Sequence, residues 1–170
     1  MVEMASGAGA SIAAVILLFA GALKVRHRPE FASQITAYEI VPAAVAVALG
    51  SVLPFLEILA GVLVLILPRA GGPLSAALFL SFAAAVEINL LRGRTELRCG
   101  CFGPSGQRPI RGGHVAMNLA LAAAAAVAGL GDGPPSLAAA RMGLSMLLLA
   151  MLLLVGRELR GAKQESEARR

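Results

Sequence analysis

The chain has 170 residues, of which 58% are hydrophobic, 15% charged and 4% aromatic. Soluble domains are about 45–50% apolar and about 25% charged, so this composition excludes an ordinary water-soluble enzyme. The net charge is +5, but Arg and Lys crowd between apolar runs, which is typical of membrane orientation rather than of nucleic-acid binding. Two cysteines are too few for a secreted scaffold with several disulfides or for a four-cysteine metal site.

Apolar runs long enough to cross a bilayer, about 20 residues each, recur along the chain. They lie at 4–23, 43–67, 71–91, 112–131 and 137–156. The fourth run is rich in alanine, and Arg141 lies near the start of the fifth. The sequence therefore predicts an all-α integral membrane bundle of four to five transmembrane helices, with five favoured. This domain is expected over residues 1–157, followed by a charged, disordered cytoplasmic tail over 158–170.

Glycine and proline mark the expected connections between these runs. Residues 71–73 (Gly-Gly-Pro) should break the chain between the second and third, and residues 133–135 (Gly-Pro-Pro) between the fourth and fifth. Between the first and second runs, apolar residues recur at helical spacing from Pro29 to Pro42; these are Phe31, Ile35, Tyr38 and Val41. This spacing predicts an amphipathic helix at the membrane interface, or a re-entrant segment.

The basic residues are distributed unevenly between the two ends of the predicted helices. Thirteen of the 15 Lys and Arg residues follow the first run, the third run or the fifth, whereas Arg69 and Arg141 lie at the other end. Basic residues favour the cytoplasmic side, so five spans place the N-terminus outside and the C-terminus in the cytoplasm. No Lys or Arg precedes the first run, so we expect this helix to be retained rather than cleaved as a signal.

Both cysteines lie in the loop after the third run, as Cys99-Gly100-Cys101. One interpretation treats them as small apolar residues, but a polar loop rich in Gly and Pro offers no core to bury them. A disulfide between residues at this spacing requires the backbone to bend, and Gly100 permits the bend. Arg94 and Arg98 favour the thiolate form of the cysteines. We therefore predict that Cys99 and Cys101 form a catalytic redox dithiol.

Two other interpretations of this loop remain open. Cys99 and Cys101 together with His114 are ligand types that suit copper(I) or mercury(II), and Met117 follows His114 on the same helical face. The loop could instead dock a partner in a non-catalytic assembly subunit. If Cys99 and Cys101 form a redox dithiol, the protein is a thiol–disulfide oxidoreductase. If they bind a metal ion with His114, it is a metal-handling membrane protein. If the loop only docks a partner, it has neither activity.

Polar side chains inside the predicted spans are costly to bury and usually have partners. Glu57 lies in the middle of the second run, and Lys24 at the end of the first is its expected partner. Glu87 and Asn89 lie near the end of the third run. We favour a structural role for these residues, as polar contacts between helices, over a role of Glu57 in proton or quinone chemistry. A quinone is compatible with a membrane redox protein, but no residue set in the sequence identifies one or any other cofactor.

The chain resembles the methylamine-utilisation MauE family, a branch of the DoxX-like membrane proteins. The most specific likeness is the sequence INLLRGR at 88–94, followed by CGCFG at 99–103. The other residues that carry it are Gly21, Lys24, Phe31, Tyr38, Pro42, Pro54, Glu57, Gly61 and Asn118. Together they cover about residues 10–130, and nothing recognisable follows residue 135.

This resemblance implies a helical bundle in the bacterial inner membrane. It also implies a thioredoxin-like partner and a role in maturing the disulfide-rich small subunit of methylamine dehydrogenase, or other envelope proteins. The paired cysteines imply a role in disulfide formation or transfer, similar to that of the quinone-coupled membrane proteins that generate disulfides. Disulfide formation belongs on the oxidising outer face, whereas the charge distribution places Cys99 and Cys101 inside. Either the dithiol is a cytoplasmic-side relay, or one apolar run is not a span and the topology differs.

Overall fold

The computed structural model describes residues 2–100 and 109–130. In these residues the regular elements are all helices: α1 (Val2–Arg26), α2 (Arg28–Ala37), α3 (Ala43–Ile66), α4 (Pro68–Leu91) and α5 (Gly112–Gly129). Within the described chain, four of them are long and apolar enough to cross a membrane, namely α1, α3, α4 and α5. The predicted all-α bundle is therefore confirmed for four spans. The fifth predicted span and the charged tail lie outside the described residues.

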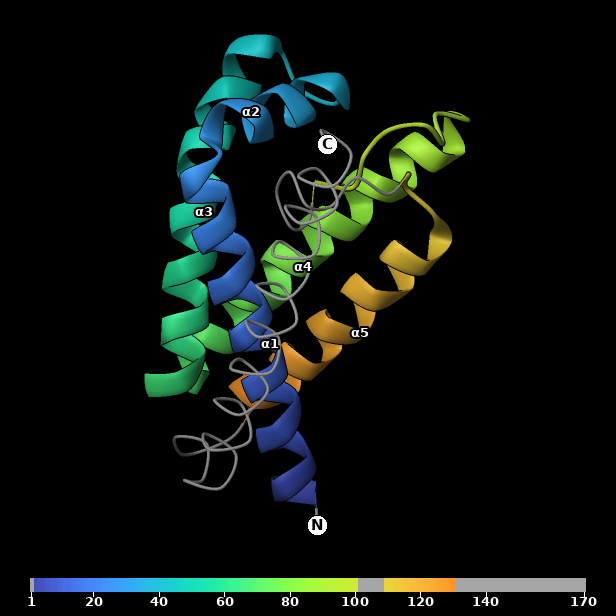
Figure 1. Ribbon diagram of the computed structural model, residues 1–170. Coiled ribbons are helices and arrows are strands. Elements are labelled where there is room, and N and C mark those ends of the chain that lie inside the picture. The colour runs from blue at the N-terminus through green and yellow to red at the C-terminus, as the bar shows by residue number, and fades with distance from the viewer. Residues whose placement is uncertain (1, 101–108, 131–170) are drawn as a thin grey trace, which may run out of the picture.

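The four long helices run alternately up and down, so that the ends of distant segments meet. Figure 1 shows α1 beside α3 and α4 beside α5, and these two pairs have the most extensive contacts in the bundle. A helix of 24 residues is about 36 Å long at about 1.5 Å per residue, enough for a hydrocarbon core of about 30 Å. At one end, α2 lies beside the start of α3, and its last residue, Ala37, is hydrogen-bonded to Arg94 just after α4 (Figure 1).

The short helix α2 lies between the first two spans, where an amphipathic helix or a re-entrant segment was expected. Pro29 lies in its first turn, where a missing backbone N–H costs nothing, and the helix ends at Ala37. Phe31 on its inner side is buried, whereas Glu30 and Ser33 are exposed. The segment therefore covers the end of the bundle rather than crossing it.

The turn between α3 and α4 falls earlier than the glycine pattern predicted. Leu67 alone separates the two helices, with φ −144° and ψ 72°. Because the residue before a proline avoids helical geometry, Pro68 fixes the break at this point. The prediction of a break at residues 71–73 was wrong, since these residues lie in the first turns of α4.

Gly71 and Gly72 instead allow neighbouring helices to approach α4 closely. A Cβ added to Gly71 would lie 2.1 Å from the backbone N of Val64, and one added to Gly72 would lie 2.6 Å from the carbonyl oxygen of Ala125. Small residues at such contacts are a common device in membrane helix packing. The same pattern holds in the main core cluster, where the four long helices meet and most of the buried residues are alanines, among them Ala13, Ala60, Ala76 and Ala125.

The outer surface of the bundle is apolar. Large exposed hydrophobic side chains line the outside of α3, α4 and α5; they include Val47, Val52, Phe55, Leu80 and Leu119. Buried polar side chains in the described residues are few, and they are Ser11, Lys24, Glu57, Ser75, Asn89 and Asn118. This inverted distribution, with apolar side chains outside and polar ones inside, fits a lipid bilayer as the surrounding medium.

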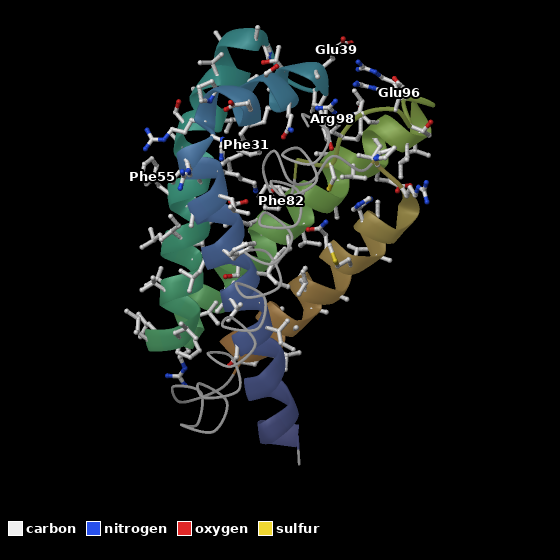
Figure 2. The ribbon with its side chains drawn as sticks, viewed as in Figure 1. Phe31, Glu39, Phe55, Phe82, Glu96 and Arg98 are labelled. Atoms are coloured by element: carbon white, nitrogen blue, oxygen red, sulfur yellow. The ribbon has the colours of Figure 1, made fainter. Side chains whose placement is uncertain are left out.

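The described Lys and Arg residues gather at the end of the bundle that carries α2, with Arg69 as the exception. Glu39, Glu96 and Arg98 lie at this end in Figure 2, while Phe55 lies on the side of α3. The uneven charge predicted from the sequence is therefore present in the folded bundle. Which face of the membrane this end occupies stays a prediction.

Candidate functional site

Cys99 lies just beyond a short neck that closes the loop between α4 and α5. Arg98 and Pro109 form an isolated antiparallel bridge, and the backbone N–H of Ile110 donates to the carbonyl oxygen of Leu97 over 2.8 Å. Ile110 is buried and packs with Tyr38 and Val86. The neck fixes where the loop leaves the bundle, and Cys99 packs against the same cluster. Cys101, the other predicted catalytic cysteine, lies outside the described residues.

Tyr38 holds the backbone at Cys99 in place. Its hydroxyl donates to the carbonyl oxygens of Arg98, at 3.1 Å, and Cys99, at 3.3 Å. The ring is buried, and burial raises the pKa of Tyr38 to about 12, so the phenol stays a proton donor at neutral pH. The sequence suggested Tyr38 as one apolar position of a helix and as one of the residues that carry the family resemblance. The helical spacing of apolar residues placed Tyr38 near the end of that helix. No sequence pattern could have predicted its hydrogen bond to Arg98, 60 residues away.

Arg92 and Arg94 join the end of α4 to the end of α2. Arg94 donates to the carbonyl oxygen of Ala37 at 3.0 Å and forms an ion pair with Glu39 at 3.1 Å. Arg92 donates to the carbonyl oxygen of Glu39 at 3.1 Å. The last carbonyls of a helix lack partners within it, and these guanidinium groups supply them. In the sequence both arginines were topology signals and part of the resemblance, and Arg94 was a charge near the cysteines. Their role in positioning α2 was missed.

Gly100, which the sequence analysis named as the residue that permits a bend, has a left-handed backbone conformation. Its φ is +66°, in the region that favours glycine. A Cβ at this position would lie 2.5 Å from Oε1 of Gln34. That oxygen is buried and has no hydrogen-bond partner. Gly100 thus lets the loop lie directly against the Gln34 carboxamide, a residue that the sequence analysis did not single out.

Lys24 and Glu57 form the buried ion pair expected from the sequence. The Lys24 ammonium donates to Oε1 of Glu57, and the two side chains are 2% and 0% exposed. The ammonium also lies 4.7 Å from the ring centre of Phe31 and 4.9 Å from that of Phe82, within cation–π range. The helices approach closely here, because a Cβ on Gly21 would lie 2.8 Å from the carbonyl oxygen of Pro54.

A cavity of about 340 Å³ lies between the buried Lys24 side chain and the loop residues Cys99 and Gly100. Its wall comes from the end of α1, from α2 and its following turn, from α3, from α4 and from the Cys99 loop. Most lining residues are apolar, and the chemically distinctive ones are Lys24, Phe31, Gln34, Tyr38, Phe82 and Cys99. Figure 2 shows Phe31 and Phe82 inward of the end that carries Glu39 and Arg98. The structure therefore brings Cys99, Gly100 and Lys24 to one cavity, with Glu57 behind Lys24.

Asn89 does not join this site. It is fully buried in α4, where Nδ2 donates to the carbonyl oxygen of Ala85 at 3.1 Å and Oδ1 has no partner. Asn118 is bonded in the same way within α5, to the carbonyl oxygen of His114 at 2.8 Å. Glu87, by contrast, is exposed. The polar contacts expected of Asn89 and Glu87 between helices are therefore not found among the described residues.

His114 has a structural task at the start of α5. Its Nδ1 accepts the backbone N–H of Arg111 at 3.0 Å and so caps the helix. Residues 2–100 and 109–130 contain no group of three or more His, Cys, Asp or Glu side chains placed to hold a metal ion. Cys101, the remaining member of the Cys99, Cys101 and His114 set, is outside the described residues.

Comparisons with known proteins agree on one family. The model of the family described as methylamine utilisation protein MauE matches residues 2–131. MauE of Paracoccus denitrificans is 34% identical over 153 residues, which cover 87% of this chain and 82% of that protein. MauE of Methylophilus methylotrophus is 33% identical over 117 residues, covering 66% and 62%. No solved structure gives a significant match.

Proposed function

Because the chain belongs to the MauE family of methylamine-utilisation proteins, we propose that it is a membrane thiol–disulfide redox protein in which Cys99 and Cys101 alternate between dithiol and disulfide. The observation that carries this proposal is the placement of Cys99. Its backbone is fixed by Tyr38, and it lines an apolar cavity beside a charged helix end. A cysteine held in this way is suited to repeated thiol–disulfide exchange with a partner protein at the membrane boundary.

The chemistry is a pair of thiol–disulfide exchanges. A thiolate of a protein partner attacks the Cys99–Cys101 disulfide, forms a mixed disulfide and releases one cysteine as a thiolate. A second thiolate of the partner then attacks the mixed bond. The partner leaves with a disulfide, and Cys99 and Cys101 are left as a dithiol. Two electrons and two protons have passed from the partner to this chain, and the reverse sequence reduces the partner.

The partner class that fits this exchange is a thioredoxin-like protein, since such proteins carry a Cys-X-X-Cys pair in which the pKa of the attacking thiol is lowered. The names of the relatives refer to methylamine utilisation. The substrate that the family resemblance implies, and that we propose, is the disulfide-rich small subunit of methylamine dehydrogenase or another envelope protein. The site of action is the bacterial inner membrane. The distribution of basic residues places the N-terminus outside and Cys99, Cys101 and the C-terminus on the cytoplasmic side, so in this orientation the dithiol acts as a cytoplasmic-side relay.

Single cysteine variants test the proposal. Cys99→Ser and Cys101→Ser should each abolish maturation of the partner protein in a complementation assay. The cysteine that remains should trap the partner in a mixed disulfide visible on a non-reducing gel. Thr95→Ser, an equally small change at an exposed position in the same loop, is the control and should keep full activity. Full activity of both cysteine variants would show that the loop acts without thiol chemistry.

A further inference from the structure

We propose that the cavity beside Cys99 binds the ring of a lipid-soluble quinone, which accepts the electrons of the Cys99–Cys101 dithiol. This inference rests on the proposed thiol–disulfide function and names its electron acceptor. The cavity itself is built entirely from described residues, which come from α1, α2, α3, α4 and the neck of the Cys99 loop.

The size and lining of the cavity suit a single substituted ring. Its volume of about 340 Å³ lies at the lower end of the range of about 300–1,000 Å³ for small-molecule sites. Phe31, Tyr38 and Phe82 contribute aromatic rings to an otherwise mainly aliphatic wall. Aromatic side chains pack well against flat ligands by offset stacking or edge contacts. The long chain of a quinone need not enter, because only its ring requires the enclosed space.

The polar groups in the wall distinguish a quinone from a lipid chain. Oε1 of Gln34 is buried without a hydrogen-bond partner, and a lipid chain would leave it so at a cost of about 1–3 kcal/mol. The Lys24 ammonium has three N–H donors, and Glu57 accepts one of them. A quinone offers carbonyl oxygens to the N–H donors, and its reduced form offers O–H donors to the Gln34 oxygen. Both redox forms of the ligand therefore have partners in one cavity.

The location of the cavity gives a quinone a route from the membrane. Ile40, Leu49 and Leu53 line it, and Ile40 is 38% exposed, so the wall reaches the surface between α2 and α3. The neighbouring outer face of α3 carries exposed Val45 and Val52, the kind of surface that lipid covers. A quinone dissolved in the bilayer would therefore meet the opening from the apolar side.

The electron transfer balances without another reactant. The two thiols lose two electrons and two protons and form one S–S bond. The quinone takes up the same two electrons and two protons, and its two carbonyl groups become the two hydroxyl groups of the quinol. The disulfide is then ready for the next thiolate of the partner, and the quinol returns to the lipid to be oxidised elsewhere.

A single fluorophore makes this proposal testable by binding alone. The chain has one tyrosine and no tryptophan, so its intrinsic fluorescence comes from Tyr38, which lines the cavity. Full-length protein in detergent micelles would be titrated with ubiquinone-1, a short-chain benzoquinone that quenches nearby tyrosine. Using the Cys99→Ser variant removes redox turnover from the measurement. The result expected is saturable quenching, beyond that of a free tyrosine derivative in the same micelles.

Two matched alanine variants locate the binding. Ala85 lines the cavity and the adjacent Ala84 is exposed on the same helix, outside the cavity lining. Ala85→Leu fills the space meant for the ring and should weaken binding by about tenfold or more, whereas Ala84→Leu should leave it unchanged. If Ala85→Leu does not fold, a photoreactive azidoquinone on the unaltered protein replaces it, and adducts should map to α2 and α4 lining residues.

The outcomes separate this inference from the proposed function. Quenching that does not saturate, or that is equal in both alanine variants, would overturn the quinone site. Azidoquinone adducts confined to the outer face of α3 would do the same. If ubiquinone-1 fails to bind while mixed disulfides with a partner still form, the thiol function stands and the quinone site falls. If it binds in the cavity but never oxidises the dithiol of the unaltered protein, its assigned role as electron acceptor is refuted.

Discussion

The Tyr38 hydroxyl donates a hydrogen bond to the carbonyl oxygen of Cys99, joining the end of α2 to the loop that follows α4. The same hydroxyl bonds to the carbonyl oxygen of Arg98. These two residues are separated from Tyr38 by about 60 positions, and yet one phenol fixes both. The reactive loop is therefore held by the helix that lies across the end of the bundle, and its geometry depends on that helix.

Tyr38→Phe should loosen the loop without unfolding the bundle. The ring stays, but a hydrogen bond with a net value of about 0.5–1.5 kcal/mol is lost. We expect a small decrease in thermal stability and faster alkylation of Cys99 after reduction. The control is Ser51→Ala, which removes an exposed hydroxyl that donates to the carbonyl oxygen of Val47 within α3. Equal alkylation rates in both variants would contradict a holding role of Tyr38.

The raised pKa of Tyr38 predicts a specific titration. Because the chain has one tyrosine, tyrosinate absorbance reports this residue alone. The folded protein should titrate near pH 12 and the denatured chain near 10, since burial favours the neutral phenol. The stabilisation by the buried phenol is complete below pH 10 and is lost as the pH rises toward 12. A midpoint near 10 in the folded protein would show that the phenol is not buried.

Gly100 and Gly93 form a matched pair for testing the contact with Gln34. Both have positive φ, +66° and +73°, so an alanine at either position carries similar backbone strain of about 1–2 kcal/mol. A Cβ on Gly93 meets nothing within 4 Å, whereas one on Gly100 meets Oε1 of Gln34. Because the Gln34 side chain can rotate, the extra effect of Gly100→Ala should appear in ubiquinone-1 binding rather than in stability. Equal binding by both alanine variants would contradict a role of the Gln34 amide.

The Lys24–Glu57 pair predicts non-additive stability changes. Removing one partner leaves the other charge buried, which typically costs about 3–5 kcal/mol. Lys24→Met and Glu57→Leu should therefore each lower the stability in detergent strongly. The double variant, which leaves no buried charge, should lose less than the sum of the single changes. Strictly additive losses, measured by thermal unfolding, would mean that the two side chains do not interact.

The orientation of the bundle predicts which side of the membrane exposes the cysteines. The basic end that carries Cys99 should face the cytoplasm, so a membrane-impermeant thiol reagent should label it only after permeabilisation. Labelling of intact, reduced spheroplasts would place the cysteines outside and require a different topology. A single cysteine introduced at exposed Ala70, beside the opposite end of α3 and α4, is the control in a Cys99→Ser, Cys101→Ser background and should show the reverse pattern.

The sequence was sufficient for the features that follow from hydropathy and charge. It predicted the four described spans, a short helix between the first two of them and the partnership of Lys24 with Glu57. Bilayer length and the cost of a buried charge leave few alternatives to the spans and the ion pair. The sequence-based prediction failed where contacts between helices determine the role of a residue. The glycines at 71 and 72 looked like a turn but serve close packing, while Pro68 sets the break.

The composition of the candidate site was only partly predictable for the same reason. Cys99 and Gly100 stood out by residue type, but Gln34 and Tyr38 become relevant only because α2 folds back over the end of α4. Asn89 was expected to contact another helix, and its amide instead bonds to the preceding turn of its own helix. A local pattern cannot choose between these outcomes, since both satisfy the amide nitrogen.

The redox state of the two cysteines tests the central claim most directly. Purified full-length protein would be equilibrated in glutathione buffers from reducing to oxidising, quenched in acid, alkylated and weighed by mass spectrometry. The account predicts one reversible transition in which two alkyl groups are gained or lost together, because Cys99 and Cys101 form one disulfide. If both cysteines are alkylated in every buffer, including the most oxidising, the loop holds no redox dithiol and the proposed function is wrong.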